Sequence, residues 1–347
     1  MKRAELVKVL EAVQPALAAN ALVPVYTCYM FRNNSITAFN DVLGIVAKLP
    51  TDAFHKEFAV DGRTLLGLLQ NSHAEEAQFE VTEDDVIMTA GKSNVKMPYF
   101  DEREFLFEEP DVKKWDATLP INDDLLLGIE VCLTTSSKDL SQPAIMGICF
   151  NLEGKAHALY SCDGDAITRY IPKHTIGSGI YTVPNTFCDE LLKIAKEAKK
   201  GNLQINKDWA KATLDNGFVL YGRIIVNETP LNHQKMIDDS LKDVKSFAAL
   251  PLGLHDALAR ARVLADVESK PTHINVEEGK MRLFTSTAMG DLRDELKIKG
   301  HPDIKADVHA SLMHRSLQYC DQLSITERVT AYCLDNVITQ VVGNLGK

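Results

Sequence analysis

The sequence predicts an α+β protein in which one module is repeated three times. Three similar helix starts, marked by Val60, Val183 and Val308, lie 123 and 125 residues apart in a chain of 347 residues. After each of these helices comes a short alternating strand, at 79–82, 203–206 and 323–326. A period near 120 residues is that of a whole domain and not of a solenoid repeat. We therefore expect three domains, 1–112, 113–245 and 246–347.

The first repeat is expected to place its elements in the order helix, strands, helix, strands. Leu6, Val9, Leu10 and Val13 recur on one face, which predicts a helix over 2–17, with Pro15 in its last turn. Strands are expected over 25–31 and within 36–49, with a turn at 32–35 between them. A second helix over 61–70 precedes three strands within 78–107.

The other two repeats show the same order. In the second, a helix over 122–137 precedes strands at 144–151, 156–161 and 167–171, and a helix over 184–199 precedes strands at 203–206, 210–215 and 218–226. In the third, a helix over 254–267 precedes strands at 272–277, 280–286 and 294–299, and a helix over 308–319 precedes strands at 323–325, 330–335 and 337–342. Runs of strands between single helices fit α+β layering better than a parallel βαβ sheet.

Composition indicates an ordinary globular protein of the cytoplasm. The sequence is 45% hydrophobic and 25% charged, and no apolar run approaches the ~18 residues of a membrane span, so we expect no membrane association. Its seven cysteines include no CxxC pair, which favours small buried residues in a reducing compartment over a zinc site.

Basic side chains recur on several expected helices, although the net charge is −10. A solvated helix face is one explanation. The other is a set of positive faces that contact DNA phosphates without reading bases, because a local field and not the net charge acts on a ligand. The acidic helix over 122–137 argues against this second explanation. The candidate DNA-contacting residues are Lys2, Arg3, Lys8, Lys138, Lys193, Lys196, Lys199, Lys200, Arg260 and Arg262.

Catalytic and nucleotide-binding motifs are missing: the sequence has no GxxxxGK[ST], no HExxH and no GxSxG. One local cluster, Asp163 and Asp165 with His157 nearby, leaves two interpretations open. It is either a metal site for hydrolysis or a tight Asp-Gly turn between two strands. The turn is favoured, because no second acidic cluster supplies further ligands. We expect no catalytic residues, no resident metal and no cofactor.

Two motifs give the chain a resemblance to a known family. The stretch 158–167, ALYSCDGDAI, and the helix start 181–184, YTVP, resemble those of the bacterial sliding clamp, the β subunit of DNA polymerase III. The resemblance extends over the whole length, because the order of three repeats is the same. It implies the DNA clamp fold and a divergent member, of bacterial or phage origin.

The resemblance implies a function. Two such subunits close head to tail into a homodimeric ring, with helices along the channel and sheets outside, and the ring encircles double-stranded DNA. A clamp loader and a replicative DNA polymerase are the implied partners, and short peptides dock in a hydrophobic pocket. The implied pocket residues are Ile145, Cys162, Gly164, Ile167, Pro230, Met236, Val341, Val342 and Leu345.

Departures from the family pattern affect partner choice. Asp165-Ala166 stands where the family commonly has His-Arg, and Asn20 replaces a usual basic residue ahead of Val23-Pro24. We therefore expect a non-enzymatic processivity clamp with its own peptide preference. A metal-dependent hydrolase using His157, Asp163 and Asp165 remains an alternative, as does an interaction scaffold that never closes into a ring.

Overall fold

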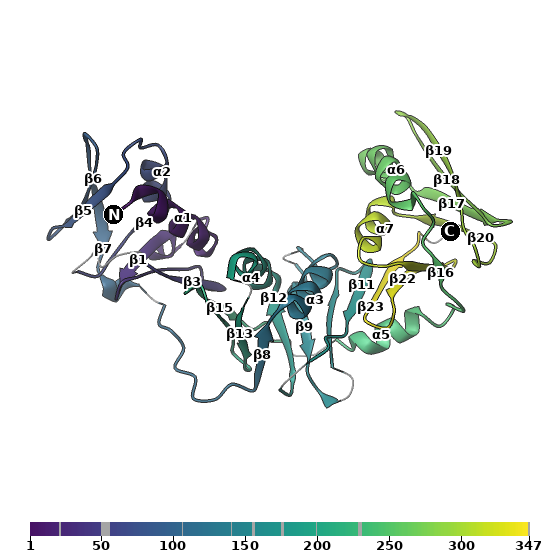
Figure 1. Cartoon of the computed structure of the whole chain (residues 1–347), viewed down its shortest axis with the longest axis horizontal. Coiled ribbons are helices and arrows are strands. Elements are labelled where there is room, and N and C mark those ends of the chain that lie inside the picture. Colours follow the sequence, from purple (N-terminus) through teal and green to yellow (C-terminus); the bar gives the residue numbers. More distant parts are fainter. Residues whose placement is uncertain are drawn as a thin grey trace. The chain divides into compact units, whose positions relative to one another are not determined.

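The computed structural model of the chain describes residues 1–20, 22–49, 56–105, 107–139, 141–154, 157–174, 177–198, 200–227 and 231–345. Contacts divide it into two compact units, each of which is discontinuous in sequence. Unit 1 contains Met1–Asp123 and Thr186–Ile224, and unit 2 contains Asp124–Asn185 and Ile225–Lys347. Figure 1 shows the elements of both units.

One order of elements, a short strand, a helix and three strands, occurs six times along the described chain. In the first segment only a bridge between Lys2 and Glu76 stands for the short strand. The first two segments contain α1 (Arg3–Val13), β1 (Cys28–Arg32), β2 (Ser35–Phe39), β3 (Leu43–Lys48), and then β4 (Phe58–Asp61), α2 (Gly62–Gln70), β5 (Ala77–Val81), β6 (Asp85–Ala90) and β7 (Ser93–Phe100).

The remaining four segments repeat this order with few changes. The third and fourth contain β8 (Ala117–Ile121), α3 (Asp123–Leu133), β9 (Gly147–Asn151), β10 (Ala158–Cys162), β11 (Ala166–Tyr170), β12 (Ile180–Pro184), α4 (Asn185–Ala198), β13 (Gly201–Ile205), β14 (Trp209–Leu214) and β15 (Val219–Arg223). The fifth and sixth contain β16 (Ala248–Ala249), α6 (Leu254–Glu268), β17 (Thr272–Glu277), β18 (Lys280–Thr287), β19 (Gly290–Lys297), β20 (Ile304–Val308), α7 (Ala310–Leu317), β21 (Gln322–Ile325), β22 (Val329–Leu334) and β23 (Ile338–Gly343). A further helix, α5 (His233–Ser240), lies between the fourth and fifth segments.

The helices and main strands expected from the sequence are present, and the differences are local. The first helix ends at Val13 and not at residue 17, because Pro15 enforces the short 3₁₀ turn Gln14–Ala16. The strand expected at 25–31 begins only at Cys28, after a second 3₁₀ turn, Pro24–Thr27. The short strands before the helices and helix α5 were not expected.

Each pair of consecutive segments exchanges its short strands. β4 pairs with β1, and β20 pairs with β17, while β16 pairs with β21. In the middle pair β12 joins β9 in unit 2, and β8 joins β13 in unit 1. This exchange explains why the middle repeat contributes one sheet to each unit.

Sheets then join across repeats through their last strands. β3 pairs with β15 in an 11-stranded sheet of unit 1, in the order β5-β6-β7-β4-β1-β2-β3-β15-β14-β13-β8. β11 pairs with β23 in an eight-stranded sheet of unit 2, β12-β9-β10-β11-β23-β22-β21-β16. A four-stranded sheet of unit 2 has the order β19-β18-β17-β20. All of these pairings are antiparallel.

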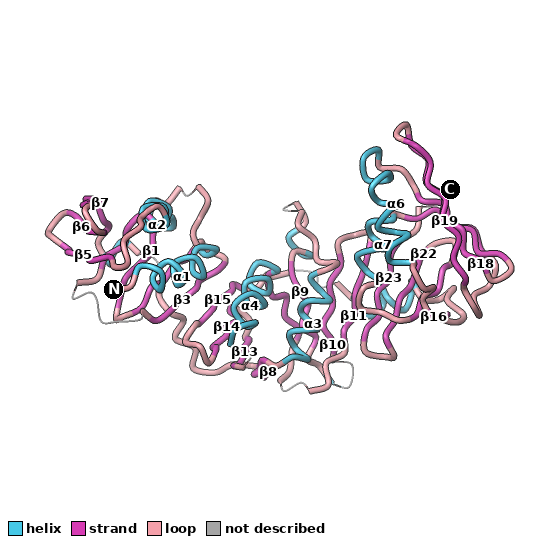
Figure 2. Tube along the Cα trace, turned by 45° about the horizontal axis from the view of Figure 1, so that its top comes forward, coloured by secondary structure: helices cyan, strands magenta, loops and turns pink. Residues whose placement is uncertain are grey.

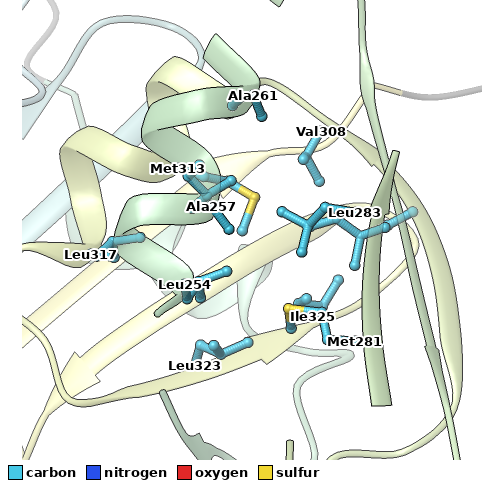
Figure 3. Close-up of a cluster of buried hydrophobic side chains, with 14 of the residues drawn as sticks. Leu254, Ala257, Ala261, Met281, Leu283, Val308, Met313, Leu317, Leu323 and Ile325 are labelled. Atoms are coloured by element: carbon cyan, nitrogen blue, oxygen red, sulfur yellow. The ribbon is translucent and has the colours of Figure 1, made fainter. Parts of the chain in front are cut away.

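The core of the last repeat shows how helices cover the sheets. Helices α6 and α7 lie side by side in both views of unit 2 (Figures 1 and 2). Ala257 and Ala261 of α6 are fully buried, so small side chains allow this close approach. Met313 of α7 and Leu283 of β18 fill the space beneath them (Figure 3). Burial of such a contiguous apolar cluster is the main stabilising contribution to the fold.

Candidate nucleic-acid interface and partner pocket

Helix α5 covers an apolar face of the eight-stranded sheet. Asn232 caps the helix by accepting a hydrogen bond from the backbone N–H of Lys235 at 3.0 Å. Ile237 is fully buried against the sheet, and Tyr160 beneath it donates a 2.7 Å hydrogen bond to Gln234. The helix therefore fixes one wall of the face on which the pocket is expected.

Four expected pocket residues meet under this helix. Ile145, Cys162, Ile167 and Val341 share one apolar cluster with Ile237, and each is less than a tenth exposed. Burial also raises the pKa of the Cys162 thiol to about 11, so that it is a neutral apolar group at physiological pH. These four side chains are covered in this structure, while a cavity of about 380 Å³ beside the start of α5 is lined by Cys149 and Tyr160 of the same cluster and by Leu231.

The other five expected pocket residues do not join this cluster. Val342 faces the opposite side of β23 from Val341 and packs in the core of the last repeat, because successive strand residues alternate between faces. Gly164 lies in the adjoining turn, Met236 on α5 is 39% exposed, and Leu345 is half-buried and hydrogen-bonds Asp307 through its backbone. Pro230 lies outside the described residues.

Asp163 organises the turn between β10 and β11. Its Oδ1 accepts hydrogen bonds from the backbone N–H groups of Asp165 and Ala166, at 3.1 and 2.9 Å. Its Oδ2 accepts a 2.7 Å bond from Arg315 of α7. Gly164 follows with φ of +98°, a conformation that glycine adopts without strain. Both carboxylate oxygens are thus engaged in holding the turn, which supports the structural interpretation of this motif.

The metal-site alternative gains no support from the positions of its three residues. His157 and Asp163 flank opposite ends of β10, so their backbones lie roughly 20 Å apart at a rise of about 3.3 Å per residue. The ring Nε2 of His157 lies 3.2 Å from the carbonyl oxygen of Pro172. Within the ranges that the structure describes, no group of three or more His, Cys, Asp or Glu side chains is arranged to hold a metal ion.

Most of the expected DNA-contacting side chains are engaged in local interactions. Arg3 donates to the carbonyl oxygens of Leu69 and Ala74, and thereby caps the end of α2. Lys8 pairs with Glu197 at 3.0 Å, and both side chains are largely exposed. The remaining ion pairs are Lys2–Glu5, Lys193–Glu190, Lys193–Asp189, Arg260–Asp294 and Arg262–Asp266.

Three expected residues are exposed and without an ion pair to another residue of the described ranges: Lys138, Lys196 and Lys200. Lys199 lies outside those ranges. The six helices of the repeated segments carry eight Lys and Arg against eleven Asp and Glu, a net formal charge of −3. The assignment of these residues to DNA contact stays a prediction. Helices α1, α4 and α6 carry both signs of charge, the charged residues of α3 are all acidic, and the one Lys or Arg of α2 and of α7 has no acidic neighbour on its helix.

In the described chain, the last strands of four segments pair with one another across repeats, and those of the other two segments, β19 and β7, keep an open edge. β19 pairs with β18 alone, and β7 pairs with β6 on one side and with β4 only through Tyr99 and Phe100 on the other. In position within their segments, β19 corresponds to β3 and β11, and β7 corresponds to β15 and β23. Open, regular edges of this kind are the parts of a sheet that pair with another chain.

Six βαβββ segments with exchanged short strands and sheets joined across repeats define the DNA clamp fold. The chain is similar over its full length to solved sliding clamps with this fold. A putative DNA polymerase III β subunit from Eubacterium rectale is 16% identical, with 99% of this chain and 97% of that chain covered and a TM-score of 0.86. The DNA polymerase III β subunit from Thermotoga maritima is 15% identical, with coverages of 100% and 98% and a TM-score of 0.85.

A third similar structure contains a bound compound. It is a sliding clamp from Pseudomonas aeruginosa bound to griselimycin, 14% identical, with coverages of 100% and 98% and a TM-score of 0.85. No protein-family model and no curated protein sequence matches the chain. No helix in the described ranges is both long and apolar enough to cross a lipid bilayer. At these identities the comparisons establish the fold: the chain folds as a DNA polymerase III β-type sliding clamp.

Proposed function

We propose that this protein is a DNA sliding clamp without catalytic activity, formed by three domains over 1–112, 113–245 and 246–347. Two copies close head to tail into a ring around double-stranded DNA. The ring tethers a replicative polymerase, and a clamp loader places it on DNA. The mixed charge of the helices suits this role, because a ring that holds DNA topologically needs only weak phosphate contacts.

The observation that carries the proposal is the way the repeats join. At both junctions inside the chain, the two strands that pair are the last strands of their segments. One strand ends the first half of a repeat and the other ends the second half of the next repeat, as in β3–β15 and β11–β23. The same rule leaves β19 and β7 as the open ends of the series. A second copy that pairs its β7 with β19 continues the rule, and the contact is head to tail.

The internal junctions also predict the register of this pairing. Ile45 and Thr168 lie opposite Leu220 and Gln340, and each is paired in its own hairpin with the residue seven positions earlier. Leu292 is the equivalent residue of β19, because it pairs with Thr285.

On β7 the equivalent position falls at Val95 or Lys96. Leu220 and Gln340 each lie eight residues after their hairpin partners. In the β6–β7 hairpin no pair has this spacing, because Val95 lies seven residues after its partner and Lys96 nine residues after its own. Leu220 and Gln340 are fully buried, whereas Val95 is half-buried and Lys96 is exposed. Facing direction therefore selects Val95 opposite Leu292.

Charges on the other face of the two strands agree with this register. With Val95 opposite Leu292, Lys96 stands opposite Asp291, and Lys92, in the turn just before β7, falls opposite Glu295. Opposite charges in directly opposed positions stabilise a strand pair, and like charges destabilise it. Beside β19, Val263 and Val267 on α6 are 69% and 68% exposed, and the partner copy would cover them.

Disulfide trapping tests the interface and its register together. Directly opposed residues in an antiparallel pair have Cα atoms about 4.5–5.5 Å apart, within reach of a disulfide. The variant K96C/D291C is expected to give a covalent dimer on mild oxidation, whereas K96C/E295C, which is four residues out of register, is not. K96C alone controls for the native thiols. Equal cross-linking of both double variants, or a monomer of the wild-type protein in sedimentation at all concentrations, would refute this interface and favour the scaffold alternative.

Retention on DNA tests the ring itself. The protein is expected to stay on closed circular DNA after loading and to leave once the circle is cut, because its hold is topological. The cross-linked K96C/D291C ring should dissociate from a circle even more slowly and should still slide off cut DNA. Equal retention on both forms of DNA would contradict encirclement.

We also propose that the face under α5 docks partner peptides, and that α5 moves to admit them. Griselimycin, which is bound in the Pseudomonas aeruginosa clamp, is a suitable probe. Met236 on α5 is 39% exposed, so M236E should weaken griselimycin binding without unfolding the protein. Leu252 is 97% exposed elsewhere in unit 2, and L252E is the matched control. Unchanged affinity in M236E would show that the docking face lies elsewhere.

A further inference from the structure

Three nitrogen-bearing side chains gather where α6 and α7 pack together. The imidazole rings of His255 on α6 and His314 on α7 have centroids 4.1 Å apart. Nη1 of Arg262, two turns further along α6, lies 3.4 Å from Nδ1 of His314. This cluster of His255, His314 and Arg262 is distinct from the side-chain cluster under α5, and none of the contacts described above uses its two histidines.

The hydrogen bond fixes the protonation state of His314. Arg262 can only donate, so Nδ1 of His314 accepts and its proton resides on Nε2. Nε2 is itself buried, with no hydrogen-bond partner among the described residues. Desolvation, followed by the proximity of His255 and Arg262, lowers the pKa of His314. The ring is therefore neutral at physiological pH, and protonation at Nδ1 would set a cation directly against the guanidinium.

Other charged groups around the cluster are already engaged or only partly compensate it. Asp256 lies 3.7 Å from the His255 ring, and Asp266 lies 3.7 Å from Arg262, both with largely exposed side chains. Next to His314 on α7, Arg315 turns away to Asp163. On the underlying sheet, Asp294 of β19 is held by Arg260, and Glu268 at the end of α6 accepts from the backbone of Ala288.

A bound anion would offset the repulsion between a protonated His314 and the guanidinium of Arg262. Placed between the rings and the guanidinium, it would accept from Arg262, His255 and a protonated His314 at once, and it would replace cation–cation repulsion by charge-assisted hydrogen bonds. His255 lies in the first turn of α6, where the helix dipole favours negative charge, and His314 lies in the last turn of α7, where the dipole favours its protonated form. Binding of the anion and uptake of a proton would then be thermodynamically linked.

We propose that His255, His314 and Arg262 form a proton-dependent site for a backbone phosphate of DNA. The site rests on the proposed function, because α6 and α7 would then face the DNA channel. It would make the grip of the ring on DNA stronger as the pH falls, while the ring itself stays closed.

Affinity for a short linear duplex tests the proposal, because such a duplex cannot be held topologically. We expect wild-type protein at constant ionic strength to bind several-fold more tightly at pH 6.0 than at pH 7.5, with a limit of roughly tenfold for each unit by which binding raises a pKa. The variant H255Q/H314Q should lose most of this ratio. R262Q, which keeps both histidines, should weaken binding at both pH values.

His273 supplies the matched control. It is an exposed histidine of β17 in the same repeat, and its ring lies 2.6 Å from Asp307. H273Q should retain the wild-type ratio, and thermal unfolding of each variant checks that it is folded. An equal ratio in wild type and H255Q/H314Q, or an equal loss in H273Q, would overturn the proposal.

Two further measurements distinguish a failure of this phosphate site from a failure of the proposed ring. Histidine resonances of the wild-type protein are followed by NMR with inorganic phosphate and with the duplex. A shift of the His255 and His314 resonances at low phosphate concentration, without a response to duplex, would overturn the assignment to DNA. Retention on circular DNA at pH 8 does not need the cluster, so its loss there would refute the proposed ring and not this site alone.

Discussion

Separate substitutions of Asp163 and Asp165 distinguish a structural turn from a metal site, because the two interpretations predict different consequences for the loss of each carboxylate. Replacement D163A removes two hydrogen bonds to backbone N–H groups, worth roughly 1 kcal/mol each in net terms. It also leaves Arg315, which is 35% exposed, without its partner; after allowance for solvent screening this adds about 1 kcal/mol. We expect D163A to lower the free energy of unfolding of unit 2 by about 3 kcal/mol.

The control is D165A in the same turn. The Asp165 side chain is exposed, and only its backbone groups make hydrogen bonds in the described structure, so its loss should change stability by less than about 0.5 kcal/mol. Both tryptophans, Trp115 and Trp209, belong to unit 1, so unfolding in urea is best followed by circular dichroism, with hydrogen exchange over 158–171. Equal destabilisation by the two substitutions, or tight divalent-metal binding lost in D163A, would refute the turn interpretation.

Two further predictions concern stability. G128A on α3 should lower the free energy of unfolding by about 1–3 kcal/mol, because an added Cβ would lie 2.5 Å from the buried ring of Tyr170. G67A on α2, where an added Cβ would meet no neighbouring atom within 4 Å, should raise it by up to about 1 kcal/mol. Hydrogen exchange of the two helices measures both effects, and similar effects would contradict the steric argument. His301 predicts a pH dependence. Burial lowers its folded-state pKa, and its Nε2 accepts from the N–H of Ile325 at 2.8 Å, so the unfolded chain binds the proton more readily. The free energy of unfolding of unit 2 should therefore fall as the pH drops below about 6.5, H301Q should reduce the slope, and a flat profile would exclude this linkage.

Repetition and alternation in the sequence were enough to predict the elements that bury most of the chain. Val60, Val183 and Val308 mark equivalent strand ends, β4, β12 and β20, and the helix that follows each is where it was expected. Four of the nine expected pocket residues meet in one cluster, because a strand's period of two assigns its residues to a face. The same rule puts Val342 on the other face, which could be known only once its neighbour Val341 was placed in the sheet.

Helix α5 shows why part of the site could not be predicted. Its residues Ile237 and Leu241 are separated by one helical turn after the cap Asn232, and this was the available signal. The helix is short and polar overall, so its sequence does not distinguish it from a linker. What makes it a wall of the site is contact with strands about 70 residues earlier in the chain, such as the bond from Tyr160 to Gln234.

The sequence by itself determined that the protein is three copies of one α+β module, because hydrophobic periodicity is a local property that each copy carries. Only the tertiary structure decided how the copies exchange short strands, which edges stay open at β7 and β19, and which basic side chains are already paired. These features depend on backbone pairing and on charges brought together from distant segments. Backbone groups are the same in every residue, and an ion pair such as Arg315–Asp163 joins residues 152 positions apart, so neither leaves a pattern in the local sequence.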